Sequence, residues 1–214
     1  MALHALNYKK INKREHNFQD KIVASFRINF DHKDGTFPNA FGTNNTDKIN
    51  KITTCFFNFG NDTPISTHII SSMPVHRANG IKVEICDDEK KILLAWTTLI
   101  QENNPDIIIG YNILGFDFKY LKNRSVYLNI FDKFAKLNKI NDEISQFKER
   151  HILNCDLGDN HIYYFEMIGR LIIDIRKVMQ HIYGYKIDII DSHIKLIDGL
   201  DRCILVNEIF NKIV

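Results

Sequence analysis

One short apolar run constrains the fold of this chain more than any other feature. The segment Asp106–Gly110, DIIIG, is apolar through its middle, follows the helix-stopping pair Asn104-Pro105, and leads into a polar turn. A strand with one face in water alternates apolar and polar residues, so an unbroken apolar run predicts a strand that is buried on both faces. Because helices must cover both faces of such a sheet, we expect a layered α/β fold.

The other segments predict elements that suit this fold. β-branched and aromatic residues indicate strands at residues 21–30, 51–59, 65–71 and 81–86, a second buried strand at 170–174, and a hairpin that pairs 151–157 with 162–167. Helices are expected at residues 88–102 (with Asp87 as the N-cap), from 116 through 121, at 175–182 and at 207–213. We expect residues 1–20 to be a loose lead-in, residues 122–150 to be irregular, and residues 21–214 to form one domain.

Composition narrows the setting of the protein but not its function. The chain has 214 residues, of which 44% are hydrophobic and 25% charged, as in ordinary soluble domains, and its formal net charge of +2 neither requires nor excludes a nucleic-acid partner. No signal-peptide core or bilayer-length apolar run is found, and no two cysteines have the spacing of a metal or redox motif. These features predict an intracellular protein of the cytoplasm or nucleus, cellular or viral in origin, that is neither secreted nor membrane-bound and has reduced thiols at Cys55, Cys86, Cys155 and Cys203.

The segment Asn104–Leu121, NPDIIIGYNILGFDFKYL, carries a resemblance to a known family. It resembles the second exonuclease motif of family B DNA polymerases, N-P-D-(I/V)-(I/L)-x-G-Y-N-(I/x)-x-x-F-D. Residues 34–40 and 47–52 are similar to the G-x-F-P loop and the following strand of that family, and residues 163–180 and 184–190 to its G-R-x-x-x-D and Y-K-L-D-x-V segments. The resemblance covers residues 21–190 and implies a ribonuclease-H-like α/β domain, with a mixed central sheet and flanking helices.

The resemblance implies 3′→5′ exonuclease chemistry, which uses two metal ions held by carboxylates. The family supplies an Asp-x-Glu pair on its first strand, the Asp of the second motif, and the Asp of a Tyr-x-x-x-Asp third motif. In this chain Asp117 matches the second motif, but the register set by the G-x-F-P loop places Arg27 and Asn29 at the Asp-x-Glu pair. Arginine cannot bind a metal and asparagine adds no charge, so we expect no bound metal, and Mg²⁺ only if activity is retained.

Two observations leave room for other carboxylates. A slipped register would bring Asp31 and Asp34 to the first motif, although they lack the Asp-x-Glu spacing. We expect the third motif to lie beyond the C-terminal end of the chain, since Tyr185 and Asp188 have the wrong spacing for it.

Two residues at motif positions, Asp174 and Arg27, each have two possible interpretations. Asp174 matches a family position outside the four metal ligands and is equally suited to cap the helix that begins at Ile175. For Arg27, one hypothesis is that the guanidinium pairs with Asp117 and replaces the metal as its counter-charge. The alternative is that Arg27 extends to solvent.

The resemblance also implies a way of binding DNA. The family holds a single-stranded 3′ end with the Asn of the second motif and nearby aromatic residues, which here are Asn112, Tyr111 and Phe116. The alternative is that Tyr111 and Phe116 are core aromatics. A basic set could contact phosphates or could simply form a solvated face; it comprises Lys119, Lys122, Arg124, Lys133, Lys136 and Lys139.

Three functional hypotheses follow. The first is an exonuclease-like domain that binds single-stranded DNA but has lost its nuclease activity. The second is the N-terminal part of a split or truncated polymerase, which acts in replication and proofreading with a partner chain that carries the polymerase domain. The third is a non-catalytic interaction module that binds neither DNA nor divalent ions.

Overall fold

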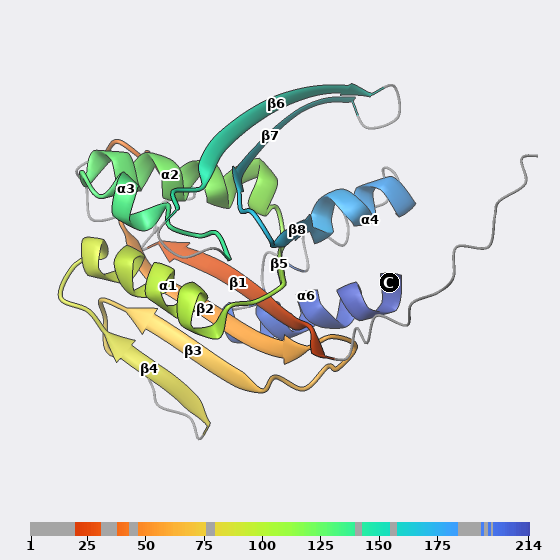
Figure 1. Cartoon of the computed structure of the whole chain (residues 1–214), viewed down its shortest axis with the longest axis horizontal. Coiled ribbons are helices and arrows are strands. Elements are labelled where there is room, and N and C mark those ends of the chain that lie inside the picture. The colour runs from red at the N-terminus through yellow and green to blue at the C-terminus, as the bar shows by residue number, and fades with distance from the viewer. Residues whose placement is uncertain are drawn as a thin grey trace, which may run out of the picture.

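The computed structural model describes residues 20–30, 38–42, 47–75, 80–139, 143–154, 158–183, 194, 197 and 199–214. Its centre is a six-stranded mixed sheet in the order β4-β3-β2-β1-β5-β8 (Figure 1). Strand β1 pairs antiparallel with β2, and β2 with β3, whereas the β3–β4, β1–β5 and β5–β8 pairs are parallel. The strands are β1 (Ile22–Phe30), β2 (Ile49–Asn58), β3 (Ser66–Ser71), β4 (Ile81–Ile85), β5 (Ile107–Gly110) and β8 (Leu171–Asp174).

Helices cover both faces of this sheet, as the apolar run predicted. Helices α1 (Glu89–Asn103), α2 (Phe118–Tyr127) and α3 (Phe131–Phe134) lie over one face, and α4 (Ile175–Tyr183) and α6 (Gly199–Ile213) over the other (Figure 1). Strand β1 divides its side chains between these layers, because successive residues of a strand point to opposite faces. Phe26 packs in the first core with Trp96 of α1, and Val23 packs in the second with Phe210 of α6. This is the mixed α/β architecture expected of a ribonuclease-H-like domain.

The middle of the chain is more regular than its sequence predicted. Helix α2 continues to Tyr127, α3 follows, and residues 146–154 and 158–166 form a two-stranded antiparallel ribbon of β6 (Gln146–Asn154) and β7 (Gly158–Glu166). The irregular stretch expected over residues 122–150 was therefore wrong for residues 122–127, 131–134 and 146–150, whereas residues 135–139 and 143–145 form neither helix nor strand. Short amphipathic helices gave little periodic signal there, and the ribbon begins several residues before the predicted hairpin.

Other boundaries also differ from the sequence prediction. The N-cap of α1 is Asp88 rather than Asp87, because the Asp88 carboxylate accepts a hydrogen bond from the Lys91 amide at 2.8 Å. Strand β8 lies at the edge of the sheet, which leaves Leu171 55% exposed instead of buried on both faces. Helix α6 (Gly199–Ile213) contains residues 207–213, which were expected to be part of a last helix, and it begins at Gly199.

Several predictions fall outside the described residues. These concern the lead-in up to residue 19, the G-x-F-P loop up to residue 37, Asp31, Asp34, Cys155, Tyr185 and Asp188. Within the part of the chain that the structure describes, no helix is long and apolar enough to cross a bilayer.

Candidate functional site

The turn after β5 fixes the position of Asp117. Asn112 adopts a left-handed conformation with φ of 66°, and the chain then forms the single π-helical turn η3 (Ile113–Asp117) before α2. Insertions of this kind are frequent at functional sites. A Cβ atom on Gly115 would lie 2.3 Å from Oδ1 of Asn112, so the turn requires glycine at that position unless the Asn112 side chain moves. The motif is therefore also a structural unit.

Asp174, at the end of β8, holds this turn in place. Its carboxylate accepts hydrogen bonds at 2.9 Å from the backbone amides of Asn112 and Leu114, and at 3.0 Å from that of Arg176 at the start of α4. Burial raises the pKa of Asp174, and these amides oppose that rise by stabilising the charged form. Asp174 therefore caps helix α4 and also stabilises the turn after β5.

Asp117 lies in a very different environment. In the described chain its carboxyl group receives no hydrogen bond or ion pair, and it does not cap α2. Burial raises the pKa of Asp117 to about 8, the nearby charge of Arg27 lowers it, and the charge of Asp174 raises it. The carboxyl group is consequently mostly protonated at neutral pH, which makes it a poor metal ligand until it loses its proton.

Arg27 lies beside Asp117. It projects from β1, opposite Thr53 of β2, and its Nε atom is buried without a hydrogen-bond partner. Both Arg27 and Asp117 line a cavity of about 10 Å³, room for roughly one water molecule. No ion pair or hydrogen bond joins the two residues, so Arg27 acts on Asp117 through its charge across the cavity and does not simply extend to solvent.

Helix α6 closes the cavity from the opposite side. Arg202, Cys203 and Val206 line it, and the guanidinium of Arg202 lies 5.3 Å from the centre of the Tyr111 ring. The sequence prediction missed these residues. An Arg and a Val four residues apart match no motif, so only the docking of α6 reveals that Arg202 and Val206 share this cavity.

The sheet face beneath α6 is unusually polar for a buried surface. Buried side-chain atoms without hydrogen-bond partners lie on β1, on β2 and on α6, and they belong to Ser25, Arg27, Asn29, Thr53 and Asn207. A Cβ atom on Gly199 would lie 2.9 Å from Oγ1 of Thr53 and 3.4 Å from Oδ1 of Asn29, so the helix starts in close contact with this polar strip. Buried polar atoms without partners are rare and costly in native proteins, so among the described residues this interface is less stabilising than an apolar one of the same size would be.

The residues expected to hold DNA are not equally accessible. Tyr111 is only 4% exposed and belongs to the core beneath α6. Phe116 is partly exposed; its ring stacks on Tyr120 at 5.4 Å and contacts Phe30 edge-on at 5.9 Å. Asn112 is also partly exposed. In the described structure Asn112 and Phe116 are therefore partly accessible, whereas Tyr111 is not.

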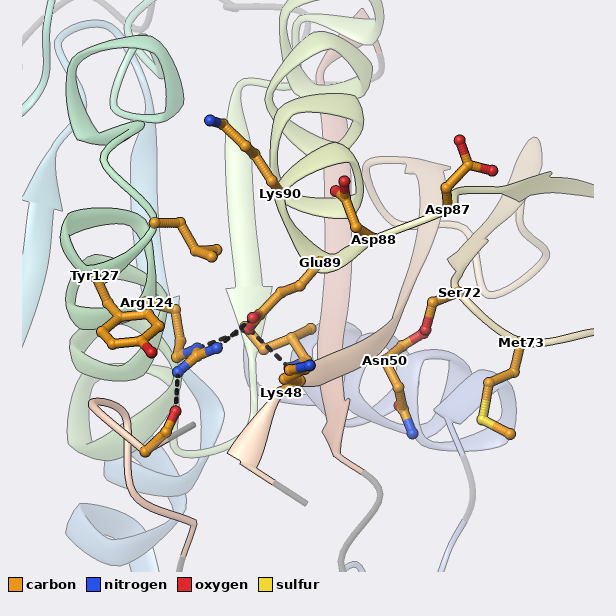
Figure 2. Close-up of a pocket in the computed structure, with 13 residues that line it drawn as sticks. Lys48, Asn50, Ser72, Met73, Asp87, Asp88, Glu89, Lys90, Arg124 and Tyr127 are labelled. Carbon is orange, nitrogen blue, oxygen red and sulfur yellow. Dashed lines mark hydrogen bonds and ion pairs between the residues drawn. The ribbon is translucent and has the colours of Figure 1, made fainter. Parts of the chain in front are cut away.

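A larger cavity, of about 800 Å³, lies between the starts of α1 and β2 and the end of α2, and it shares no lining residue with the Asp117 cavity (Figure 2). A buried ion pair between Glu89 and Arg124 crosses its wall, with Arg124 Nε 2.8 Å from Glu89 Oε1. Arg124 also donates to the carbonyl oxygens of Ala40 at 3.1 Å and Gly42 at 2.9 Å. The side chain of Arg124 is therefore structural and is not available to a phosphate.

Other members of the basic set also have partners within the protein. Lys139 pairs with Asp106 at 2.8 Å, and Lys119 donates to the hydroxyl of Tyr163 at 3.0 Å. These contacts favour a structural role over phosphate binding for part of the set.

The residues around Asp117 do not fit a Mg²⁺ site. The ion requires several hard oxygen ligands, whereas the cavity offers one carboxyl group beside the permanent charge of Arg27. The described residues contain no group of three or more His, Cys, Asp or Glu side chains that could hold a metal ion. We therefore derive no metal-dependent step from this arrangement.

Comparisons with known proteins agree with the motifs. The sequence model of the family described as DNA polymerase family B, exonuclease domain, matches residues 3–191. The DNA polymerase of Pyramimonas orientalis virus is 37% identical over 117 residues, which is 53% of this chain and 10% of that protein. The DNA polymerase delta catalytic subunit of Glycine max is 29% identical over 174 residues, 80% of this chain and 16% of that protein. The chain thus spans a small part of these relatives, and it belongs to the exonuclease-domain family of family B DNA polymerases.

Proposed function

We propose that this domain is an exonuclease-like module of the family B polymerase lineage that has lost nuclease activity. The observation that carries the proposal is the position of Arg27 beside Asp117, where a metal ion would otherwise be held between carboxylates. A guanidinium repels a divalent cation, and at an effective dielectric constant of about 20 this repulsion is worth several kcal/mol at contact distances. A protonated Asp117 adds to the barrier, because the ion must first displace its proton.

We infer that α6 occupies the position of the third motif. Arg202 and Val206 then replace the Tyr and the Asp of the Tyr-x-x-x-Asp pattern, one helical turn apart and facing Asp117 across the small cavity. Val206 supplies no ligand, so of the four carboxylates only that of Asp117 remains. Three separate substitutions, at Arg27, Asn29 and Val206, would then oppose metal binding.

We also propose that the domain retains an affinity for the 3′ end of single-stranded DNA. Phe116 offers a partly exposed ring next to Asn112, and stacking on such a ring needs no metal and tolerates any base. Because Tyr111 is buried, we expect a smaller stacking surface, and therefore weaker binding, than three accessible residues would give.

Two assays test the proposal. A 3′-labelled single strand incubated with Mg²⁺ or Mn²⁺ is expected to remain intact, and any digestion that is abolished by Asp117→Asn would contradict the loss of activity. Binding of a fluorescent single strand, measured in EDTA, is expected to weaken by roughly fivefold or more in Phe116→Ala, in line with the loss of one stacking contact. Phe41→Ala is the matched control, because Phe41 is 56% exposed and is not part of the motif.

A second candidate function is to act with a chain that carries the polymerase domain. It is favoured by exposed apolar side chains at Phe41, Met73 and Tyr127, two of which line the larger cavity. Purification from the native source, followed by identification of a bound chain with polymerase motifs, would support this role in replication and proofreading. If the protein binds neither DNA nor such a chain, an interaction module remains the better description.

A further inference from the structure

Two buried thiols lie at the contact between helix α6 and the central sheet. Cys55 is in the middle of β2, opposite Ser25 of β1 and Thr67 of β3, and Cys203 is in the second turn of α6. Cys55 is 0% and Cys203 1% exposed. They lie 148 positions apart in sequence, so any bond between them would tie distant parts of the chain together.

The backbone directions bring both sulfur atoms to the same side of the sheet. Thr54 faces α1, since its hydroxyl accepts a hydrogen bond from the Trp96 indole at 3.2 Å. Its neighbour Cys55 must therefore face α6, because residues of a strand alternate between faces. Cys203 Sγ lies 3.7 Å from the carbonyl oxygen of Thr53, the residue two positions before Cys55.

The two thiols are also neighbours in one core. Both pack beneath α6, where the hydroxyl of Thr67 donates a hydrogen bond to the sulfur of Cys55 at 3.7 Å. Each thiol lies close enough to shift the pKa of the other. A disulfide requires two cysteines that approach from facing elements, which is the arrangement of strand β2 and helix α6 here.

We propose that Cys55 and Cys203 form an oxidisable pair, which a peroxide converts into a disulfide that fastens helix α6 to strand β2. This inference is independent of whether the domain cuts or binds DNA. Its structural consequence is that α6 is fixed across Arg27 and Asp117, and the small cavity between them cannot open.

The pair supplies both the attacking and the resolving thiol. The neighbouring Cys203 thiol, and then the hydroxyl of Thr67, lower the pKa of Cys55 against the opposing effect of burial. The neighbouring Cys55 thiol and burial raise the pKa of Cys203. The thiolate is the reactive form, so the thiol that loses its proton attacks the oxidant and its neighbour resolves the intermediate.

The reaction balances with hydrogen peroxide as the oxidant. The thiolate of one cysteine of the pair attacks one peroxide oxygen, the O–O bond breaks, and the other oxygen leaves as hydroxide, which takes up a proton to give water. The second cysteine then loses its proton and attacks the sulfur of the sulfenic acid. The S–O bond breaks, and the hydroxide that leaves takes up that proton to give a second water. Two thiols and one peroxide thus give one disulfide and two waters; the sulfur atoms are oxidised and the peroxide is reduced.

The polar residues beneath α6 favour access of the oxidant to the two sulfur atoms. The oxidant must reach sulfur atoms that are covered by the helix. Buried polar atoms of Thr53 and Asn207, which have no partner among the described residues, weaken the contact that covers the sulfur atoms. Local separation of α6 therefore requires less free energy than opening a fully apolar core.

The test uses the full chain in its native state. After treatment with hydrogen peroxide and alkylation of the remaining thiols, peptide mapping is expected to find the Cys55 and Cys203 peptides joined, with the loss of two hydrogens. The midpoint temperature of unfolding should rise by roughly 5–15 °C, because the bond closes a long loop, and a reductant should reverse the rise. Amide exchange over residues 199–213 should slow in parallel.

Substitutions separate this bond from general oxidation. Cys55→Ser and Cys203→Ser should each abolish both the linked peptide and the temperature shift, and Cys203→Ala provides a second variant if serine disturbs folding. Cys86→Ser is the matched control, since Cys86 is also buried but burial raises its pKa and α6 does not cover it. The proposal is overturned if the native protein gives no Cys55–Cys203 peptide, or if that peptide forms only after denaturation.

Discussion

Arg27 and Asp117 face one cavity of about 10 Å³ beneath helix α6, and no ion pair joins them. A fixed positive charge therefore lies next to a carboxyl group that holds its proton up to a pH of about 8. In this state Asp117 carries no negative charge that a metal ion would have to neutralise. The unsatisfied carboxyl group still affects the folding equilibrium, because in the unfolded chain it ionises near its usual pKa.

We expect Asp117→Asn to stabilise the protein at neutral pH. The pKa of Asp117 is raised by folding from 3.8 to about 8, so its contribution is fully present below pH 3.8 and is lost as pH rises toward 8. Asparagine does not titrate and avoids this loss. Because part of the Asp117 surface stays exposed, we expect about 1–3 kcal/mol at pH 7 and not the full equivalent of the shift.

Urea unfolding at several pH values between 4 and 8.5 measures this effect. The difference in the free energy of unfolding between the variant and the unmodified protein should grow across this range and then level off. Asp132→Asn, at a surface carboxyl group, is the control and should show no such trend. A constant difference at all pH values would mean that Asp117 is not the group that titrates.

Replacing Asp174 with alanine should destabilise the protein by about 2–4 kcal/mol. The change removes the N-cap of α4 and leaves the partly buried amides of Asn112 and Leu114 without an acceptor. Chemical denaturation gives the size of the loss, and amide exchange at residues 112 and 114 should show that it arises in the β5 turn. If the free energy of unfolding fell by less than about 0.5 kcal/mol and protection were unchanged at both amides, the turn after β5 would not depend on Asp174.

Much of the fold could be predicted from the sequence because its signals are local. The apolar run at residues 107–109 required burial on both faces, and the structure places β5 between β1 and β8 with helices above and below. The sequence could not predict that Arg202, Cys203 and Val206 line the cavity. Their place in the cavity wall depends on where α6 docks, and that position is set by contacts with β1 and β2 from far away in the sequence.

The candidate site was predicted in part for the same reason. The motif identified Asp117, and the register of β1 placed Arg27 near it, a juxtaposition found in the cavity. The sequence could not decide whether Tyr111 was a surface or a core aromatic, because an aromatic residue at a strand end suits both. Burial under Arg202 of α6 decides it, and this contact has no sequence signal of its own.

The Asn112–Gly115 contact offers a test of how the motif shapes its own turn. Gly115→Ala would place a methyl group 2.3 Å from Oδ1 of Asn112, so we expect a loss of about 1–2 kcal/mol in the free energy of unfolding. Asn112→Gly removes the obstructing side chain and keeps the left-handed conformation without strain. The double variant should therefore recover most of the loss, as a double-mutant cycle would measure. Additive effects would show that the clash is relieved elsewhere.

Restoring the carboxylates should restore metal binding only when α6 takes part. Arg27→Asp with Asn29→Glu rebuilds the first motif, but the proposed position of the third motif still holds Val206, so we expect no gain in nuclease activity. Adding Val206→Asp brings the missing carboxylate to the cavity wall opposite Asp117. In this triple variant Mg²⁺ or Mn²⁺ should raise the midpoint of thermal unfolding, because a ligand that binds the folded state stabilises it, and digestion of a 3′-labelled strand should become detectable.

The matched controls for this reconstruction carry the same number of changes. Val206→Asn in place of Val206→Asp adds a polar group of similar size without the charge, and it should give neither the thermal shift nor digestion. Asp117→Asn on the triple background should abolish both, since it removes the one carboxylate that the chain already has. Full activity in the double variant alone would place the remaining ligand elsewhere in the chain. A folded triple variant with no thermal response to either ion would show that α6 does not occupy the third-motif position, because the carboxylate on it would then lie too far from Asp117 to share an ion.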